Sequence, residues 1–212
     1  MPGHEDAIAA LEIRSVQFEK SGTRPQHFPK VSLMPEIAFV GRSNVGKSSL
    51  LNSLVNRKRI AKVSNTPGRT QLVNFFVVND TIRFVDLPGY GFAKAPRSVK
   101  ATWDEMIRGY LEGNKELRAI CALFDIRREL SDEDIALLRW LKHYRIPFIA
   151  VLTKADKLVR SHQAEALQRI SKELKPFQPF AIQLYSTTER NGRDELLKSI
   201  ATLLFTEIKN EA

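Results

Sequence analysis

Cysteine and long apolar runs are what this chain of 212 residues has least of. Its single cysteine, Cys121, cannot form an internal disulfide, which favours a reducing compartment such as the cytosol. Cys121 stands in an apolar run and is predicted to be a small buried hydrophobic residue. No apolar run approaches the roughly 20 residues that cross a bilayer, and the first residues lack the order of a secretory signal. Internal repeats and low-complexity segments are also lacking. These absences predict a soluble, non-repetitive protein that does not insert into a membrane.

The composition is that of a single globular α/β domain with small extensions. Hydrophobic residues make up 43% of the chain, enough for a core, and charged residues make up 27%. The formal net charge is +9, which suggests an anionic partner, with RNA as the natural candidate. The alternative is a basic protein whose charge serves only solubility.

One octapeptide fits the phosphate-binding pattern G-x-x-x-x-G-K-[ST], namely Gly41-Arg42-Ser43-Asn44-Val45-Gly46-Lys47-Ser48. The apolar run 37–40 before it predicts a buried strand, and 49–55 after it predicts a helix. In this context the glycines let the backbone approach phosphate oxygens, and the helix N-terminus supplies positive potential. Lys47 is then expected to contact the β- and γ-phosphates of a nucleotide, and the Ser48 hydroxyl to hold Mg²⁺. The alternative is a glycine turn before an ordinary helix.

The rest of the chain alternates between strand and helix patterns. The run Asn79-Asp80 predicts a tight turn and hence an antiparallel hairpin. Strands separated by helices predict a mostly parallel sheet of six or seven strands, with one antiparallel strand and helices on both faces. The expected helices are 6–11, 99–111, 132–143, 164–174 and 194–208. The expected strands are 15–18, 72–78, 81–85, 119–124, 148–152 and 180–184.

The strand pattern 82–85 ends in Asp86-Leu87-Pro88-Gly89. An aspartate at this place in a phosphate-loop protein holds Mg²⁺ from a second side, often through water. The backbone N–H of Gly89 is placed to bond a γ-phosphate, so loss of that phosphate would release the loop that follows. The sequence therefore predicts a nucleotide-dependent switch here.

A second strand pattern ends in Thr153-Lys154-Ala155-Asp156. A carboxylate at Asp156 can accept hydrogen bonds from guanine N1–H and the 2-amino group, a donor pair that adenine lacks. The Lys154 stem can lie across the base. Ser186-Thr187-Thr188 follows the last strand pattern, where a backbone N–H is expected to meet guanine O6. The alternative is a strand-end turn with solvated charges.

Taken together, these motifs resemble the translation-factor-like class of P-loop GTPases. The runs Pro67-Gly68-Arg69-Thr70-Gln71 and Asp86-Leu87-Pro88-Gly89-Tyr90-Gly91-Phe92-Ala93 are more specific, and they resemble the EngB (YihA/YsxC) family of bacterial ribosome-biogenesis GTPases. The resemblance covers residues 13–208. It implies a three-layer P-loop fold, with an N-terminal extension over 1–22 and a G domain over 23–210.

The resemblance also implies roles for individual residues. The family binds GTP with Mg²⁺ through residues that correspond here to Ser48 and Thr70. The first switch would be Gly68-Arg69-Thr70-Gln71-Leu72, and the second would begin at Asp86. The final guanine-contacting segment would be Tyr185-Ser186-Thr187, in which Thr187 departs from the commoner small residues. From the residues alone, Thr66 and Thr70 remain equal candidates for the metal.

The implied function is a GTP switch in assembly of the large ribosomal subunit, needed for normal cell division and septation. The expected partners are GTP or GDP and a precursor subunit with its rRNA, and the protein is expected to be a monomer. Lys47, Thr70 and Gly89 would carry catalysis. One alternative is a P-loop kinase, which Asp156 argues against by selecting guanine. The other is a cell-division protein that does not act through the ribosome.

Two residues near the phosphates bear on the rate of hydrolysis. Tyr90 stands where many signalling GTPases have a water-orienting Gln, which predicts slow intrinsic hydrolysis. Asn44 resembles the loop Asn of cation-stimulated GTPases, which predicts that K⁺ raises the rate. The alternative is that Asn44 only shapes the loop.

Basic residues cluster near the expected switches, which predicts an RNA contact gated by nucleotide state, against the alternative of a solvated surface. They are Arg57, Lys58, Arg59, Lys62, Lys94, Arg97, Lys100, Arg127 and Arg128.

Overall fold

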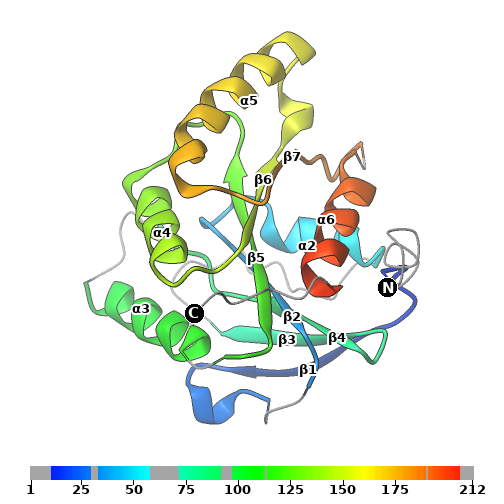
Figure 1. Ribbon diagram of the computed structural model, residues 1–212, viewed down its shortest axis with the longest axis vertical. Helices are drawn as coiled ribbons and strands as arrows, with labels where there is room; N and C mark the ends of the chain where they lie inside the picture. Colours follow the sequence, from blue (N-terminus) through cyan, green and yellow to red (C-terminus); the bar gives the residue numbers. More distant parts are fainter. Residues whose placement is uncertain are drawn as a thin grey trace.

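A seven-stranded sheet lies between two layers of helices in the computed structural model of this chain (Figure 1). The structure describes residues 11–29, 33–57, 72–91, 97–112, 114–189 and 191–205. The strands are β1 (Val16–Gly22), β2 (Glu36–Gly41), β3 (Val73–Val78), β4 (Ile82–Asp86), β5 (Leu117–Asp125), β6 (Phe148–Thr153) and β7 (Ala181–Leu184). The α-helices are α2 (Lys47–Leu54), α3 (Arg97–Leu111), α4 (Asp132–His143), α5 (Arg160–Leu174) and α6 (Arg193–Phe205). Short 3₁₀ turns span Pro25–His27, Ala155–Lys157 and Lys175–Phe177.

The sheet is mostly parallel, as the sequence predicts. Its strand order is β1-β3-β4-β2-β5-β6-β7, and β3 runs antiparallel to both of its neighbours. The turn between β3 and β4 places Asn79 at φ 52° and Asp80 at φ 57°. Asparagine and aspartate tolerate this left-handed conformation better than most residues, so the turn closes a tight hairpin. The predicted fold class is confirmed.

The N-terminal strand is longer than its sequence pattern suggests. An edge strand was expected over 15–18, but β1 extends to Gly22 and pairs antiparallel with β3. A bulge between Phe18 and Lys20 shifts its register. Pairing with β3, rather than the strand propensity of Ser21 and Gly22, extends the strand. The helix expected over 6–11 lies outside the described residues except for Leu11, and the boundary at residue 22 stays a prediction.

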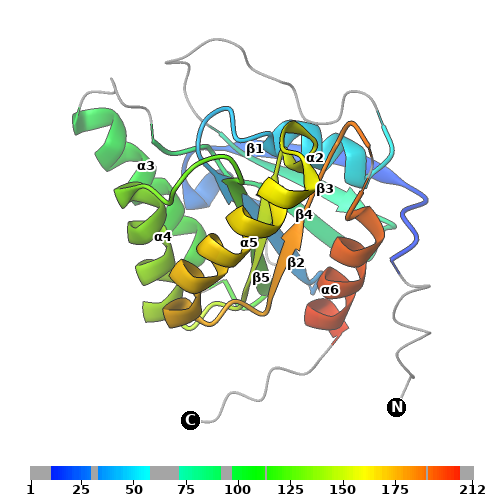
Figure 2. The ribbon, with the colours of Figure 1, turned by 90° about the horizontal axis from the view of Figure 1, so that it is seen from above.

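The two faces of the sheet carry separate cores. Helices α2 and α6 cover one face, and α3, α4 and α5 cover the other (Figure 2). Ile107, Tyr110 and Leu111 of α3 are buried in the core on its side of the sheet. Cys121 is fully buried in β5, and burial raises the pKa of its thiol, as expected for a core residue.

Several helix boundaries differ from expectation: α2 is Lys47–Leu54 rather than 49–55, α3 begins at Arg97 rather than 99, and α6 begins at Arg193 rather than 194. Helix α5 begins at Arg160 rather than 164, because its first residues, Arg-Ser-His-Gln, are polar and give no apolar period. Helix α6 is described to Phe205, so the expected end at 208 lies outside the described residues. Helix α4 begins as predicted, with Ser131 and Asp134 forming a reciprocal capping box. Within the described ranges, no helix combines the length and apolar character needed to cross a bilayer.

Candidate functional site

The phosphate-loop octapeptide leaves the carboxyl end of β2 and enters α2. Asn44 and Gly46 take left-handed conformations, at φ 65° and 107°. At Gly41 an added Cβ would lie 2.8 Å from Val45 Cγ1 and 3.0 Å from Leu123 Cβ. A side chain therefore does not fit at Gly41 without moving the loop, which gives the first glycine of the motif a steric reason.

The amino end of α2 has the character of an anion site. Gly46 is its N-cap and makes no side-chain capping hydrogen bond. The first N–H groups of a helix have no intrahelical acceptor and carry the positive end of the helix dipole. Phosphate oxygens are the ligands that this arrangement favours.

Lys47 forms an ion pair with Asp86, which ends β4. Both side chains are nearly enclosed, with exposed fractions of 12% and 10%. The second carboxylate oxygen of Asp86, Oδ2, accepts a hydrogen bond of 3.3 Å from Asn74 Nδ2 of β3. The motif that ends β4 thus meets the phosphate loop, as the two patterns together predict.

The backbone after Asp86 is attached to the phosphate loop. Ser43 N–H donates to Tyr90 O at 3.0 Å, and Tyr90 N–H donates to Gly41 O at 3.3 Å. A Cβ added at Gly89 would lie 3.3 Å from both Gly41 O and Ser43 N. A side chain at Gly89 would therefore crowd the loop, so the glycine allows these two backbones to approach.

The Tyr90 side chain points into the protein. Its hydroxyl donates to Asp134 Oδ1 at 2.7 Å, and burial, with the nearby Asp134 charge, raises the pKa of Tyr90 well above its usual value. Trp103 Nε1 donates to Pro88 O at 2.8 Å, and the Trp103 ring packs edge-on against the Tyr90 ring. The start of the expected second switch is therefore attached to both α3 and α4.

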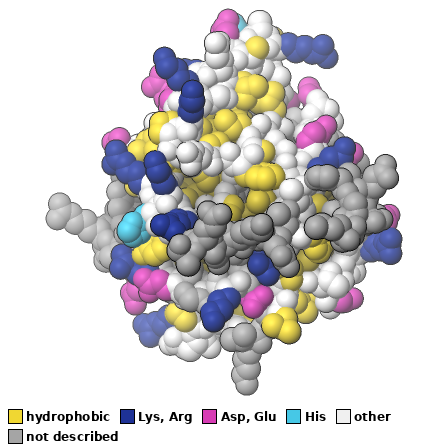
Figure 3. All heavy atoms as spheres, in the orientation of Figure 1, with side chains coloured by type: hydrophobic (Ala, Val, Ile, Leu, Met, Phe, Trp, Pro, Cys, Tyr) yellow, Lys and Arg dark blue, Asp and Glu magenta, His cyan; other side chains and the backbone are white. Residues whose placement is uncertain are grey.

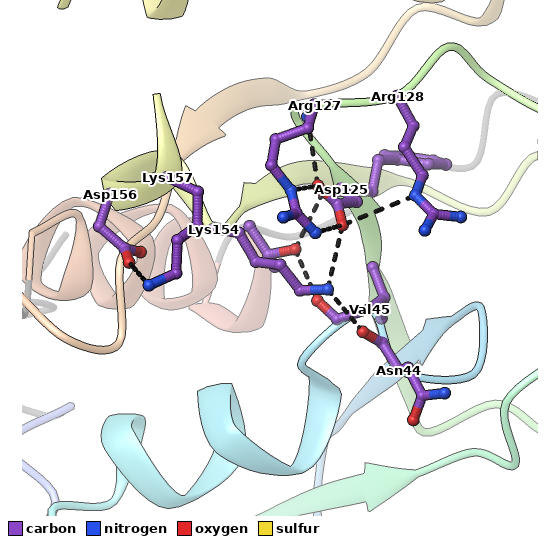
Figure 4. Close-up of polar contacts among 10 residues, drawn as sticks. Asn44, Val45, Asp125, Arg127, Arg128, Lys154, Asp156 and Lys157 are labelled. Atoms are coloured by element: carbon purple, nitrogen blue, oxygen red, sulfur yellow. Dashed lines mark hydrogen bonds and ion pairs between the residues drawn. The ribbon is translucent and has the colours of Figure 1, made fainter. Parts of the chain in front are cut away.

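A hydrogen-bonded group joins β6 to the phosphate loop (Figure 4). Thr153 Oγ1 donates to Val45 O at 2.7 Å. Lys154 Nζ donates to Asn44 O at 2.7 Å and to Asp125 Oδ2 at 3.0 Å. The motif that ends β6 thereby holds the outer side of the phosphate loop.

Asp125, at the end of β5, is a member of this group that motif reasoning missed. It also accepts two side-chain hydrogen bonds from Arg127, at 2.9 and 2.7 Å. Burial alone would raise the pKa of Asp125, but the bonds from Arg127 and Lys154 outweigh burial and lower it strongly. Its position directly after an apolar strand pattern was the available signal.

Asp156 lies on the other side of Lys154. Its Oδ1 accepts a 3.0 Å hydrogen bond from Ser186 Oγ, and its Oδ2 pairs with Lys157 at 3.2 Å. Burial opposes ionisation, but the bonds from Ser186 and Lys157 lower the pKa of Asp156 overall. Ala155 N–H donates to Tyr185 O at 3.3 Å, so the two expected guanine segments lie side by side.

The residues of the expected final guanine-contacting segment, 185–187, differ in burial. Tyr185 is 1% exposed, and its hydroxyl contacts Ser53 Oγ of α2 at 3.0 Å. Ser186 is buried beside Asp156, whereas the Thr187 side chain is exposed. The structure therefore directs Tyr185 under α2 and leaves Ser186 facing the aspartate.

The expected first switch lies almost entirely outside the described residues. The residues outside the described ranges are Gly68, Arg69, Thr70 and Gln71, together with the alternative metal ligand Thr66. Leu72 is described, and 40% of it is exposed. The proposed roles of Thr70 and its neighbours therefore stay predictions.

The chain matches the family model of 50S ribosome-binding GTPases over residues 36–154. It is 46% identical over 194 residues to a probable GTP-binding protein EngB of Geobacter sulfurreducens, covering 92% of this chain and 93% of the relative. It is 43% identical to one of Clostridium kluyveri, covering 92% and 98%.

Solved structures show the same fold. A probable GTP-binding protein EngB superposes with a TM-score of 0.63 at 22% identity, covering 80% of this chain and 98% of that chain. An Era protein, solved with MgGDPNP and a 16S ribosomal RNA fragment, superposes with a TM-score of 0.61 at 23% identity, covering 80% and 56%.

Proposed function

This chain belongs to the EngB family of P-loop GTP-binding proteins, and we propose that it is a GTP-driven switch in assembly of the large ribosomal subunit. GTP binding would order the switches and favour contact with the precursor particle. Hydrolysis and phosphate release would end that contact. The cytosol is the proposed compartment, and an effect on cell division and septation would follow from ribosome assembly.

The observation that carries this proposal is the setting of Asp156. Its lowered pKa favours the carboxylate, the form that accepts from guanine N1–H and the 2-amino group. Ser186 orients the carboxylate, and Lys154 connects this side of the site to the phosphate loop through Asn44 O. The base acceptor and the attachment to the phosphate loop thus come from neighbouring residues of one segment after β6.

The residues present suit a magnesium ion. Ser48 supplies a hydroxyl beside Lys47, and Asp86 supplies a carboxylate opposite it, and Mg²⁺ prefers such oxygen donors. When bound, the ion would neutralise charge on the phosphate oxygens. Lys47 would bond the β- and γ-phosphates, and the Gly89 N–H would contact the γ-phosphate. Thr70 is the proposed second metal ligand.

Slow intrinsic hydrolysis is part of the proposal. The Tyr90 hydroxyl is engaged with Asp134, so it is not available to orient an attacking water as a Gln amide does. Asn44 is proposed to help hold K⁺ near the phosphates. Hydrolysis should then be faster in K⁺ than in Na⁺, and equal turnover in the two salts would contradict this role.

Support for an RNA partner comes from the family and the +9 charge. On the face drawn in Figure 3, Lys and Arg side chains are spread out with acidic residues among them, rather than gathered in one patch. Arg127 and Arg128 both pair with Asp125, at 2.7 and 4.0 Å, and the Arg128 side chain is 68% exposed. Of the basic cluster near the switches, Lys58, Arg59, Lys62 and Lys94 lie outside the described residues.

The decisive test is calorimetric titration with GDP, a non-hydrolysable GTP analogue and ATP. The wild type should bind both guanine nucleotides and not ATP. Asp156→Asn should weaken GDP binding by about a hundredfold or more and shift preference toward xanthine nucleotides, because the acceptor pair is lost.

The matched control is Asp194→Asn, which changes an 80%-exposed carboxylate at the start of α6. It should leave GDP affinity unchanged. ATP binding as tight as GDP binding would contradict the proposal and favour a kinase. Absence of salt-resistant copurification with ribosomal particles would instead favour a cell-division role that bypasses the ribosome.

A further inference from the structure

We propose that Asn74 is a positioning residue for Asp86, and that the N-terminal strand β1 sets its orientation through Ser21. The proposal rests on the function argued above and deepens it, because it makes β1 part of the apparatus that prepares the magnesium site. The side chains concerned form a relay from Ser21 through Asn74 to Asp86, which we call the Asn74 relay.

The relay follows from strand register. Ser21 of β1 is the cross-strand partner of Asn74 in β3, and Asn74 is the partner of Asp86 in β4. Directly opposed residues in antiparallel strands have Cβ atoms roughly 5 Å apart, within reach of short side chains. Phe76 and Phe84, two positions from Asn74 and Asp86, belong to the core under α2 and α6, so the relay lies on that face of the sheet.

The hydrogen bonds of the relay fit one orientation of the amide. A carboxylate only accepts, so Asp86 Oδ2 must face Asn74 Nδ2, and the distance is 3.3 Å. Asn74 Oδ1 then faces Ser21 Oγ, which donates to it at 2.6 Å. The Asp86 carboxylate therefore favours this orientation, and the Ser21 hydroxyl reinforces it by bonding the amide oxygen on the other side.

The relay holds one carboxylate oxygen of Asp86 and leaves the other free to change partners. Oδ1 is the oxygen that pairs with Lys47, whereas Oδ2 is held by Asn74. When Lys47 turns to nucleotide phosphates, Asp86 can keep its orientation through Oδ2 and present Oδ1 toward the metal or its water. Residues that orient a metal-binding carboxylate typically change metal affinity about 10–100-fold when removed.

A second polar group on β1 provides a control. Glu19 pairs with Arg83 of β4 at 2.8 Å, and Arg83 also pairs with the buried Glu36 at 2.7 Å. Tyr110 of α3 donates to Glu36, so this group lies toward the opposite face of the sheet. A change at Glu19 weakens the attachment of β1 without touching the Asn74 relay.

The experiment measures the Mg²⁺ concentration at half-maximal stabilisation of the GDP complex, together with GDP affinity in EDTA. Asn74→Leu should raise the Mg²⁺ half-point about tenfold and leave the EDTA affinity within about twofold. Ser21→Ala should raise it about threefold. Ser21→Thr keeps the hydroxyl and should behave as the wild type does.

Glu19→Gln should lower the thermal midpoint and leave the Mg²⁺ half-point unchanged. The relay is overturned if Asn74→Leu and Ser21→Ala match the wild type, or if Glu19→Gln raises the half-point equally. If Asn74→Leu does not fold, the comparison of Ser21→Ala with Ser21→Thr decides the matter. A wild type that binds no guanine nucleotide would overturn the proposed function itself, a result distinct from intact, Mg²⁺-dependent binding with unaffected variants.

Discussion

The two ends of the candidate site differ in how their charged groups are paired. At the base end, Asp125, Lys154 and Asp156 have protein partners that need not be released when a base binds. At the phosphate end, Lys47 and Asp86 are each other's partners, although both are expected to act on the nucleotide or its metal. The base end is therefore preorganised, whereas the phosphate end must exchange partners.

This difference has a consequence for a switch. A preorganised base end contributes affinity common to GDP and GTP, because guanine is the same in both. Only contacts that change with the γ-phosphate can shift the protein between states. The exchange at Lys47 and Asp86, together with the attachments of Tyr90, is where such a shift can arise.

The largest expected effect is at the phosphate end. Lys47→Met removes the cation for the phosphates and leaves Asp86, which is 7% exposed, without its ion-pair partner. GDP and GTP-analogue affinities should fall by about a hundredfold or more, since charge-assisted bonds to phosphate are lost. Calorimetry should show no such loss for Lys198→Met on the exposed side of α6. Retained affinity in Lys47→Met would argue against the phosphate role.

A smaller effect is expected at Asp125, where pH makes the test specific. Because the folded-state pKa of Asp125 is lowered from 3.8, its contribution to stability is present above that value and is lost as pH falls below it. Asp125→Asn should therefore lower the thermal midpoint at pH 7, and the gap from wild type should narrow between pH 5 and pH 3. The same substitution should also lower the affinity for GDP and for the GTP analogue by about tenfold, because Lys154 loses its ion-pair partner.

The control for Asp125 is Asp80→Asn in the exposed β3–β4 turn. Asparagine also suits the left-handed backbone there, so little change in stability is expected at any pH. If the difference in thermal midpoint between wild type and Asp125→Asn stays constant down to pH 3, the ionisation of Asp125 is not coupled to folding.

Tyr90→Phe tests whether the second switch is attached through Asp134. Removing the hydroxyl should cost about 1–2 kcal/mol, or a few degrees in thermal midpoint, because a buried carboxylate loses a donor. Loosening this attachment should raise GTP-analogue affinity relative to GDP by about threefold, measured by calorimetry. A lower midpoint with an unchanged affinity ratio would assign Tyr90 a purely structural role.

The fold could be predicted because the apolar runs 37–40, 82–85 and 148–152 are each followed closely by a motif. The Asn79-Asp80 turn is a local signal, and it agrees with the structure. The start of α5 was misplaced because polar residues begin that helix. The extension of β1 to Gly22 was missed because pairing with β3, a distant segment, determines it.

The candidate site also has a part that the sequence predicts and a part that it does not. Adjacency of the motif that ends β6 to the phosphate loop follows from parallel strands ending at one edge of the sheet. Asp125 and Asn74 belong to no motif, so their contacts depend on register between strands and cannot be taken from spacing. Ser21 and Asn74 are 53 positions apart in the chain.

Thr153→Val tests the base end with the smallest expected effect. The buried Thr153 hydroxyl bonds Val45 O at 2.7 Å and Phe124 O at 3.1 Å, and valine has nearly the same shape without the donor. The loss should cost about 1 kcal/mol, seen as a thermal midpoint lower by about 2–4 °C. GDP and GTP-analogue affinities should fall together by a few-fold, with their ratio unchanged, whereas Thr153→Ser should retain both. A changed ratio would mean that the base end also distinguishes the two nucleotides, and the division between a preorganised end and an exchanging end would then be wrong.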